Sequence, residues 1–254
     1  MPTATAEDGV ELFYDAAGEG ETVVFLNDVG FGAWLWGWQH AALAGPFRVV
    51  TFDPRGVGRS EPTGPHTVER LAADCEAVLA AAGVRRAHLV GAGLGGRAAL
   101  AYAREYGRAR SLALLGTTLD GDRVDPDALE RMTRDGPEAL EPCLTPAFRE
   151  DNPDVLAGIG EWRASDDAPP AVRAAQAEAM RGYACEAPYE VTLPALVLHG
   201  ESDPVVPAAA GRDLAAALPE GEFHAVEGRH LAFVEQSKAA NDALAGFLER
   251  VGGL

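Results

Sequence analysis

Two residues late in the chain have the types and positions that acid–base chemistry needs. His230 lies between the last strand-like run and the final helical segment, and Asp203 lies in the loop after the run Ala195–His199. A histidine at a strand end, oriented by a carboxylate, can act as a general base. The alternatives are a capping or surface role for His230 and a turn cap before Pro204 for Asp203.

A glycine-rich segment, Gly91–Gly96, lies between a strand-like run and a helical one. Its spacing satisfies the dinucleotide fingerprint Gly91-x-Gly93-x-x-Gly96. That fingerprint needs an acidic residue about 20 residues further on, at the end of the next strand, and Asp120 comes late for this role. A flavin or nicotinamide protein therefore remains a remote alternative, and we expect no cofactor.

The other histidines and the cysteines do not form a metal-binding pattern. His40, His66, His88 and His224 do not have the sequence spacing that is typical of metal ligands, so we expect no metal site. Three cysteines, far apart and odd in number, argue against a disulfide framework and for a reducing compartment. The N-terminus is polar, without the apolar stretch of a secretory signal. We expect a cytoplasmic protein.

Short apolar runs alternate with Ala-rich amphipathic segments along the chain. The runs typical of strands are Val10–Tyr14, Thr22–Asn27, Arg48–Phe52, Ala87–Val90, Ser111–Leu115, Ala195–His199 and Glu222–Val226. The helical patterns are Ala33–Ala44, Thr67–Ala82, Gly95–Tyr106, Ala208–Leu218 and Leu231–Val251. This alternation predicts an α/β fold with a mostly parallel twisted sheet and helices on both faces.

The alternation stops between Leu119 and Glu190. That stretch is helical in pattern, interrupted by prolines, and acidic, with 17 carboxylates against 7 arginines and a net charge of -10. We expect residues 119–190 to form a helical cap over the carboxyl end of the sheet, where open α/β folds bind ligands. Residues 1–118 and 191–254 would then form the core.

The composition narrows the class of partner. The 254 residues include 39 Asp and Glu against 21 Lys and Arg, and the net charge is -18. Repulsion from phosphate excludes broad nucleic-acid binding and makes an anionic membrane surface unfavourable. Almost no lysine is present, which fits either a halophilic protein or a high-GC codon bias. We expect a small-molecule ligand and a monomer or homodimer.

Several segments, taken in order, carry a family resemblance. They are Asn27-Asp28-Val29-Gly30, Asp53–Ser60, Gly91–Gly95, Gly200–Pro207 and Glu227–His230. Together they resemble the α/β-hydrolase superfamily over essentially the whole chain, and most closely its small esterases, lactonases and 3-oxoadipate enol-lactonases. The first segment is similar to the Asn-Ser-Leu-Gly loop of enol-lactonases.

The resemblance implies a role for each segment. Gly91–Gly95 would be the nucleophile elbow, Gly-x-Ser-x-Gly, which lifts a serine above the sheet. The backbone N–H groups of Val29 and Leu94 would form the oxyanion hole. Asp203 would orient His230, which would be the general base.

The serine of that motif is absent, and Gly93 stands in its position, whether by nature or by engineering. Loss of the hydroxyl costs about 10⁶ in kcat in a serine hydrolase. The remaining binding site and oxyanion hole leave about 10³–10⁴ over water. We therefore expect weak or no ordinary serine-hydrolase activity.

Asp28 also departs from the pattern, because it places a carboxylate beside the expected oxyanion hole. An ionised Asp28 would oppose a developing oxyanion. The alternative is an N-cap or turn role for the helix Ala33–Ala44. The candidate pocket residues are Asn27, Asp28, Trp162 and Arg163. Trp162 with Arg163 could reach a substrate carboxylate, and so could Arg131 or Arg134.

Three functions remain open from the sequence. The first is an esterase or lactonase for small carboxylic esters or lactones that has lost its nucleophile. The second is general-base chemistry by His230 and Asp203 without a covalent intermediate, such as water activation, a lyase or isomerase reaction, or cofactor-free oxygenation. The third is a non-catalytic protein that binds a small molecule.

Overall fold

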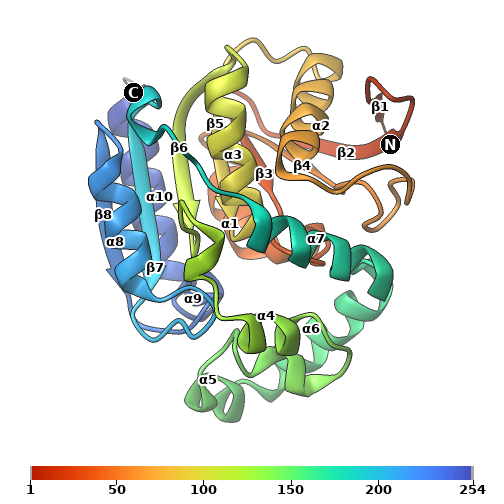
Figure 1. The fold of residues 1–254 in the computed structure, drawn as a ribbon, viewed down its shortest axis with the longest axis vertical. Coiled ribbons are helices and arrows are strands. Elements are labelled where there is room, and N and C mark those ends of the chain that lie inside the picture. Colours follow the sequence, from red (N-terminus) through yellow and green to blue (C-terminus); the bar gives the residue numbers. More distant parts are fainter. Residues whose placement is uncertain (1, 253–254) are drawn as a thin grey trace.

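The computed structural model describes residues 2–252. Within that range the sheet has eight strands, in the order β1-β2-β4-β3-β5-β6-β7-β8 (Figure 1). Pairing is antiparallel from β1 to β2 and from β2 to β4, and parallel between all other neighbours. The strands are β1 (Thr3–Thr5), β2 (Glu11–Ala17), β3 (Thr22–Leu26), β4 (Arg48–Phe52), β5 (Ala87–Ala92), β6 (Ala109–Leu115), β7 (Ala195–Gly200) and β8 (Gly221–Val226).

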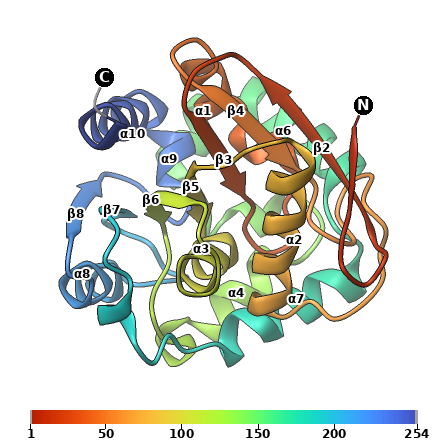
Figure 2. The same cartoon turned by 90° about the horizontal axis from the view of Figure 1, so that it is seen from above.

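Helices cover both faces of this sheet. Viewed from above, α2, α3 and α8 lie on one face, and α1 and α10 lie on the other (Figure 2). The core helices and short 3₁₀ turn are η1 (Ala33–Trp36), α1 (Gly37–Leu43), α2 (Val68–Ala81), α3 (Leu94–Glu105), α8 (Ala208–Ala217), α9 (Ala232–Glu235) and α10 (Ser237–Gly252). The predicted α/β fold is therefore confirmed.

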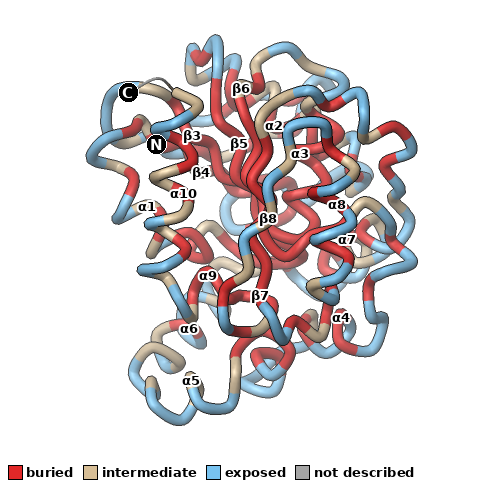
Figure 3. Tube along the Cα trace, turned by 90° about the vertical axis from the view of Figure 1, so that its left-hand side faces the viewer, coloured by how far each residue is buried: buried red, intermediate tan, exposed pale blue. Residues whose placement is uncertain are grey.

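The central strands are apolar because they are buried from both sides. β3, β5 and β7 are buried at every position, and Figure 3 shows buried strands in the middle of the molecule. Continuous apolar runs are the pattern that such strands require. For this reason each of the seven predicted strands overlaps an observed one.

The segment between β6 and β7 is helical. It contains η2 (Gly121–Arg123), α4 (Pro126–Met132), η3 (Pro137–Leu140), α5 (Pro146–Asp151), α6 (Pro153–Asp166), α7 (Pro170–Gly182) and η4 (Pro188–Glu190). A proline stands in the first turn of six of these elements, where its missing N–H costs no helical hydrogen bond. Figure 1 shows α4 to α7 beyond the carboxyl ends of the parallel strands, and we call residues 119–190 the cap segment.

Three details differ from the expected elements. β1 was not predicted, because a three-residue edge strand leaves almost no pattern. The expected helix Leu231–Val251 is divided at Gln236, whose φ of -111° and ψ of 45° are not helical. The expected helix Ala33–Ala44 begins as the 3₁₀ turn η1.

Candidate active site

The turn between β5 and α3 consists of glycines because backbone segments meet there without room for side chains. A Cβ on Gly95 would lie 2.5 Å from the carbonyl carbon of Leu26, and a Cβ on Gly91 would lie 2.5 Å from that of Gly95. Gly93 has φ +46° and ψ -109°, a conformation that residues with side chains rarely adopt. Helix α3 begins at Leu94, so the Leu94 N–H has no hydrogen-bond acceptor within the helix.

The carboxylate of Asp28 fills the space that a side chain at position 93 would occupy. A Cβ there would lie 2.5 Å from Asp28 Oδ2 and closer still to Cγ and Oδ1. Asp28 Oδ1 accepts hydrogen bonds from the backbone N–H groups of Val29 (2.7 Å) and Leu94 (2.9 Å). These are the two donors expected to form an oxyanion hole. A carboxylate of the chain itself occupies both.

The other oxygen of Asp28 contacts His230. His230 Nε2 lies 2.9 Å from Asp28 Oδ2, and Nδ1 lies 2.8 Å from Asp203 Oδ2. Asp203 Oδ1 accepts hydrogen bonds from the N–H groups of Val205 (2.8 Å) and Val206 (3.0 Å), which fix the carboxylate in the turn after β7. Asp28, His230 and Asp203 are 2%, 2% and 6% exposed. The structure thus pairs His230 with Asp203 and adds Asp28 as a third member.

Two carboxylates hold a proton on the His230 ring. Burial disfavours the charged ring, but Asp203 and Asp28 outweigh that effect and raise the pKa of His230 to about 10. Burial also acts to raise the pKa of Asp203, but His230 and His199 outweigh it and lower this pKa to about 2. At neutral pH the site is therefore a charged imidazolium whose two N–H groups point at carboxylates.

The interpretation of Asp28 as the N-cap of the helix that follows is wrong. The N-cap of η1 is Gly32, which makes no side-chain cap, whereas Asp28 bonds to Val29, Leu94 and His230. Sequence reasoning missed these contacts because they join loops that are far apart in the chain. The signal available was the combination of a missing side chain at Gly93 with an additional carboxylate in the loop after β3.

Asn27, a candidate pocket residue, braces this loop. Its Nδ2 donates to the carbonyl of Phe31 (3.0 Å), and its Oδ1 accepts a hydrogen bond from Trp36 Nε1 (2.8 Å). Trp162, another candidate, is 42% exposed and stacks on Trp34, with ring centroids 6.2 Å apart. The structure therefore brings neither residue into contact with His230.

The cap segment holds the Asp28 loop in place. The N–H of Gly30 donates to Gln176 Oε1 (2.7 Å), and the carbonyl of Gly30 accepts a hydrogen bond from the N–H of Ala168 (2.8 Å). The N–H of Gly32 donates to Asp167 Oδ1 (3.0 Å). Movement of the cap segment relative to the sheet would therefore also disturb the loop that carries Asp28.

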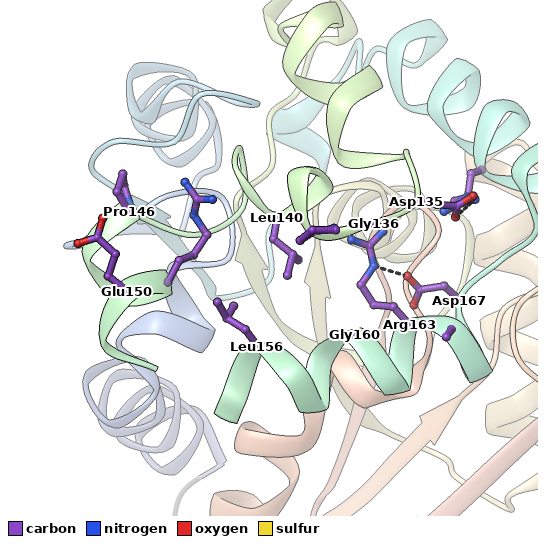
Figure 4. Close-up of a pocket in the computed structure, with 13 residues that line it drawn as sticks. Asp135, Gly136, Leu140, Pro146, Glu150, Leu156, Gly160, Arg163 and Asp167 are labelled. Carbon is purple, nitrogen blue, oxygen red and sulfur yellow. Dashed lines mark hydrogen bonds and ion pairs between the residues drawn. The ribbon is translucent and has the colours of Figure 1, made fainter. Parts of the chain in front are cut away.

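A cavity of about 610 Å³ lies within the cap segment (Figure 4). Its walls combine apolar groups with three arginines and three carboxylates. They are Asp135, Gly136, Pro137, Leu140, Pro146, Arg149, Glu150, Leu156, Gly160, Arg163, Ala164, Asp167 and Arg173. Asp28, Gly93 and His230 are not among the residues that line it.

Each of the three cavity arginines has a buried hydrogen-bond donor without a partner, and the side chains of two of them, Arg163 and Arg173, are themselves largely buried. Arg163 is bound through Nε to Asp167 (2.8 Å), but its buried Nη1 has no partner. Arg173 is bound through Nη2 to Asp135 (2.6 Å), but its buried Nε has none. Their side chains are only 10% and 6% exposed. Unpaired buried donors are costly unless a ligand or water satisfies them.

Cys143 carries a thiol close to the site. Its carbonyl accepts a hydrogen bond from the N–H of Leu231, next to His230. Burial raises the pKa of the Cys143 thiol well above its usual range, so it stays protonated and unreactive. All three cysteines are free and buried. Within residues 2–252 no group of His, Cys, Asp and Glu could hold a metal ion, and no helix is long and apolar enough to cross a membrane.

The chain is similar in sequence and fold to known hydrolases. Residues 23–243 match the model of the alpha/beta hydrolase family. The chain is 26% identical to 3-oxoadipate enol-lactonase 2 of Acinetobacter baylyi, over 98% of this chain and 96% of that protein. The enol-lactonase of Burkholderia xenovorans LB400 superimposes with a TM-score of 0.85 at 30% identity, covering 97% of this chain and 99% of that one. A thermophilic esterase from Thermogutta terrifontis gives 0.84 at 26% identity and 98% of both chains.

Proposed function

The chain belongs to the alpha/beta hydrolase family, and from this premise we propose that it hydrolyses small molecules by acid–base chemistry at His230, without a serine nucleophile. Its relatives include an enol-lactonase and an esterase. Gly93, in this proposal, stands at the position of the nucleophilic serine. Esters and lactones would accordingly be turned over weakly or not at all by the serine route.

The observation that carries this proposal is the position of the Asp28 carboxylate. Its Oδ1 accepts hydrogen bonds from both Val29 and Leu94. An ester carbonyl therefore finds neither a hydroxyl to attack it nor free donors for its oxyanion. What remains is His230, which carries a proton at Nε2 and is held by a carboxylate on each side. Proton transfer at Nε2 is the chemistry that this arrangement supports.

The cavity in the cap segment is the best place for a substrate to bind. The unpartnered donors on Arg163 and Arg173 suit a carboxylate, and the apolar walls suit a short carbon chain. These arginines supply local positive charge in a segment that is strongly acidic. Because His230 is not among the residues that line the cavity, the proposal includes a movement of the cap segment that brings bound substrate to the site.

The serine-free route is tested with a serine-reactive fluorophosphonate and a panel of short esters and lactones. We expect no covalent labelling, and ester turnover no more than about 10⁴-fold above the uncatalysed rate. We expect His230→Ala to abolish the remaining turnover because it removes the group that transfers the proton. Stoichiometric labelling of the chain, or turnover that survives in His230→Ala, would contradict the proposal.

Carboxylate binding in the cavity is tested by calorimetry with butyrate and with n-butanol, which lacks the charge. We expect butyrate to bind more tightly, and Arg173→Met to weaken its binding about tenfold or more, as loss of a hydrogen bond to a charged group does. Arg131→Met is the matched control, because Arg131 is an exposed arginine of the same segment that does not line the cavity. Equal binding of the two probes, or equal loss in both variants, would rule out a carboxylate site here.

A further inference from the structure

Glu235, in α9, joins the cap segment to residues 228–231, which we call the His230 loop. Its Oε1 accepts a hydrogen bond from the backbone N–H of Arg229 (2.7 Å), the residue before His230. Its Oε2 accepts hydrogen bonds from the N–H (2.9 Å) and from the Oγ1 hydroxyl (2.5 Å) of Thr145, which belongs to the cap segment. The two oxygens of one carboxylate therefore bind two different segments.

Two further hydrogen bonds join the same segments on either side of His230. The N–H of Leu231 donates to the carbonyl of Cys143 (2.9 Å). The guanidinium of Arg229 donates to the carbonyl of Glu141. The residues before and after His230 are thus both attached to residues 141–145, so a displacement of this stretch of the cap segment would also displace the His230 ring.

The cavity in the cap segment lies between the stretches that hold the two loops of the site. Pro146, the residue after Thr145, lines the cavity, and so does Asp167. Asp167 accepts a hydrogen bond from a backbone N–H of the Asp28 loop (3.0 Å). Figure 4 shows Pro146 and Asp167 at different ends of the cavity. One end of the cavity is therefore linked to the His230 loop, and the other end to the Asp28 loop.

We propose that Glu235 is a positioning residue, which attaches the His230 loop to the cap segment and makes the contact between His230 and Asp28 respond to a ligand in the cavity. The inference rests on the proposed function, because it takes the cavity as the substrate site and His230 as the group that transfers the proton. Networks of hydrogen bonds between packed segments carry coupling of this kind between two sites.

Exchange of the His230 ring protons with solvent measures this coupling without any need for turnover. Both ring nitrogens face carboxylates, Asp28 at Nε2 and Asp203 at Nδ1, so these protons exchange when the contacts open. A ligand that binds only the observed form of the cavity opposes opening by mass action. If Glu235 links the cavity to the His230 loop, a ligand in the cavity therefore slows exchange of the ring protons.

The first experiment compares ring-proton exchange in variants of the full chain by ¹⁵N-edited NMR at pH 7, with the signals assigned by their loss in His230→Gln. Glu235→Gln keeps the shape of the side chain but places an NH₂ group against the donors of one segment. We expect its ring protons to exchange at least about tenfold faster, as loss of a hydrogen bond allows. Thr145→Val preserves every charge, removes one donor to Oε2, and should act in the same direction.

Glu249→Gln is the matched control, because Glu249 is an exposed carboxylate on α10 that does not contact the His230 loop. It should leave the exchange of the ring protons unchanged.

The second experiment adds butyrate, with n-butanol as the uncharged control. At ten times its dissociation constant, butyrate should slow exchange of the ring protons about tenfold in the unmodified chain. In Glu235→Gln this slowing should be lost, because the His230 loop is no longer attached to the cap segment through the carboxylate.

The outcomes separate the inference from the function on which it rests. Unchanged exchange in Glu235→Gln overturns the inference. An acceleration shared equally by the backbone amides of β5 also overturns it, because it shows a general loss of stability. Butyrate that binds by calorimetry without slowing exchange overturns it too, but leaves the proposed function standing. Absence of butyrate binding contradicts the proposed substrate site itself, and the inference then falls with its premise.

Discussion

The double variant Asp28→Ser/Gly93→Ser should gain serine-esterase activity that Gly93→Ser alone does not. In the single variant the new side chain would overlap the Asp28 carboxylate, and both N–H donors would stay occupied. In the double variant the donors are free, and loss of the Asp28 charge weakens the hold on the His230 proton. The loop would then read Asn-Ser-Val-Gly.

We expect the double variant to exceed the unmodified chain at least about 100-fold on p-nitrophenyl acetate, because a serine nucleophile accounts for about 10⁶ in kcat in serine hydrolases. An acetyl burst of one equivalent and labelling by a fluorophosphonate measure the gain directly. Asp28→Ser alone is the control, since it frees the N–H donors of Val29 and Leu94 without adding a side chain at position 93. A full burst from Gly93→Ser alone would show that Asp28 does not hold this position in solution.

The contribution of His230 to stability should fall as the pH rises from about 6.5 to 10. The pKa of His230 is raised from its ordinary 6.5 to about 10 in the folded chain. A raised pKa contributes stability that is complete below the unfolded value and is lost as the pH passes through the folded value. The shift corresponds to about 5 kcal/mol. The pH dependence of Asp203 is opposite, because its pKa is lowered. Its contribution to the free energy of unfolding is lost as the pH falls from 3.8 towards 2.

Urea unfolding of the unmodified chain and of His230→Gln, at pH 6, 8 and 10, measures this effect. The difference in free energy of unfolding should be largest at pH 6 and should shrink by several kcal/mol at pH 10. His224→Gln serves as the control for loss of an imidazole, because His224 is exposed on β8 and makes none of the contacts of the site. A difference that stays constant across the range would refute the charged triad.

The fold could be predicted because its signals are local. Apolar runs such as Thr22–Leu26 and Ala195–Gly200 are buried on both faces, so their composition alone identifies them as strands. The break at Gln236 and the short strand Thr3–Thr5 carry no comparable pattern. The boundaries of the cap, the oligomeric state and the cytoplasmic location stay predictions.

The site could be predicted only in part, because its contacts are long-range. His230 and Asp203 follow strand ends that the sheet brings together, so their pairing could be anticipated from topology. The contact of Asp28 with His230 requires that no side chain is present at position 93. The contact joins loops that are far apart in the chain, so neither segment predicts it by itself. His199, at the end of β7, also approaches Asp203, with 3.3 Å between Nε2 and Oδ2.

The overlap between a side chain at position 93 and the Asp28 carboxylate also means that the two positions do not vary independently. A side chain at position 93 leaves no room for the Asp28 carboxylate between the N–H groups of Val29 and Leu94, so that carboxylate must turn away. Gly93 and Asp28 therefore form an energetically coupled pair, and the effects of substitutions at the two positions on the free energy of unfolding should not add.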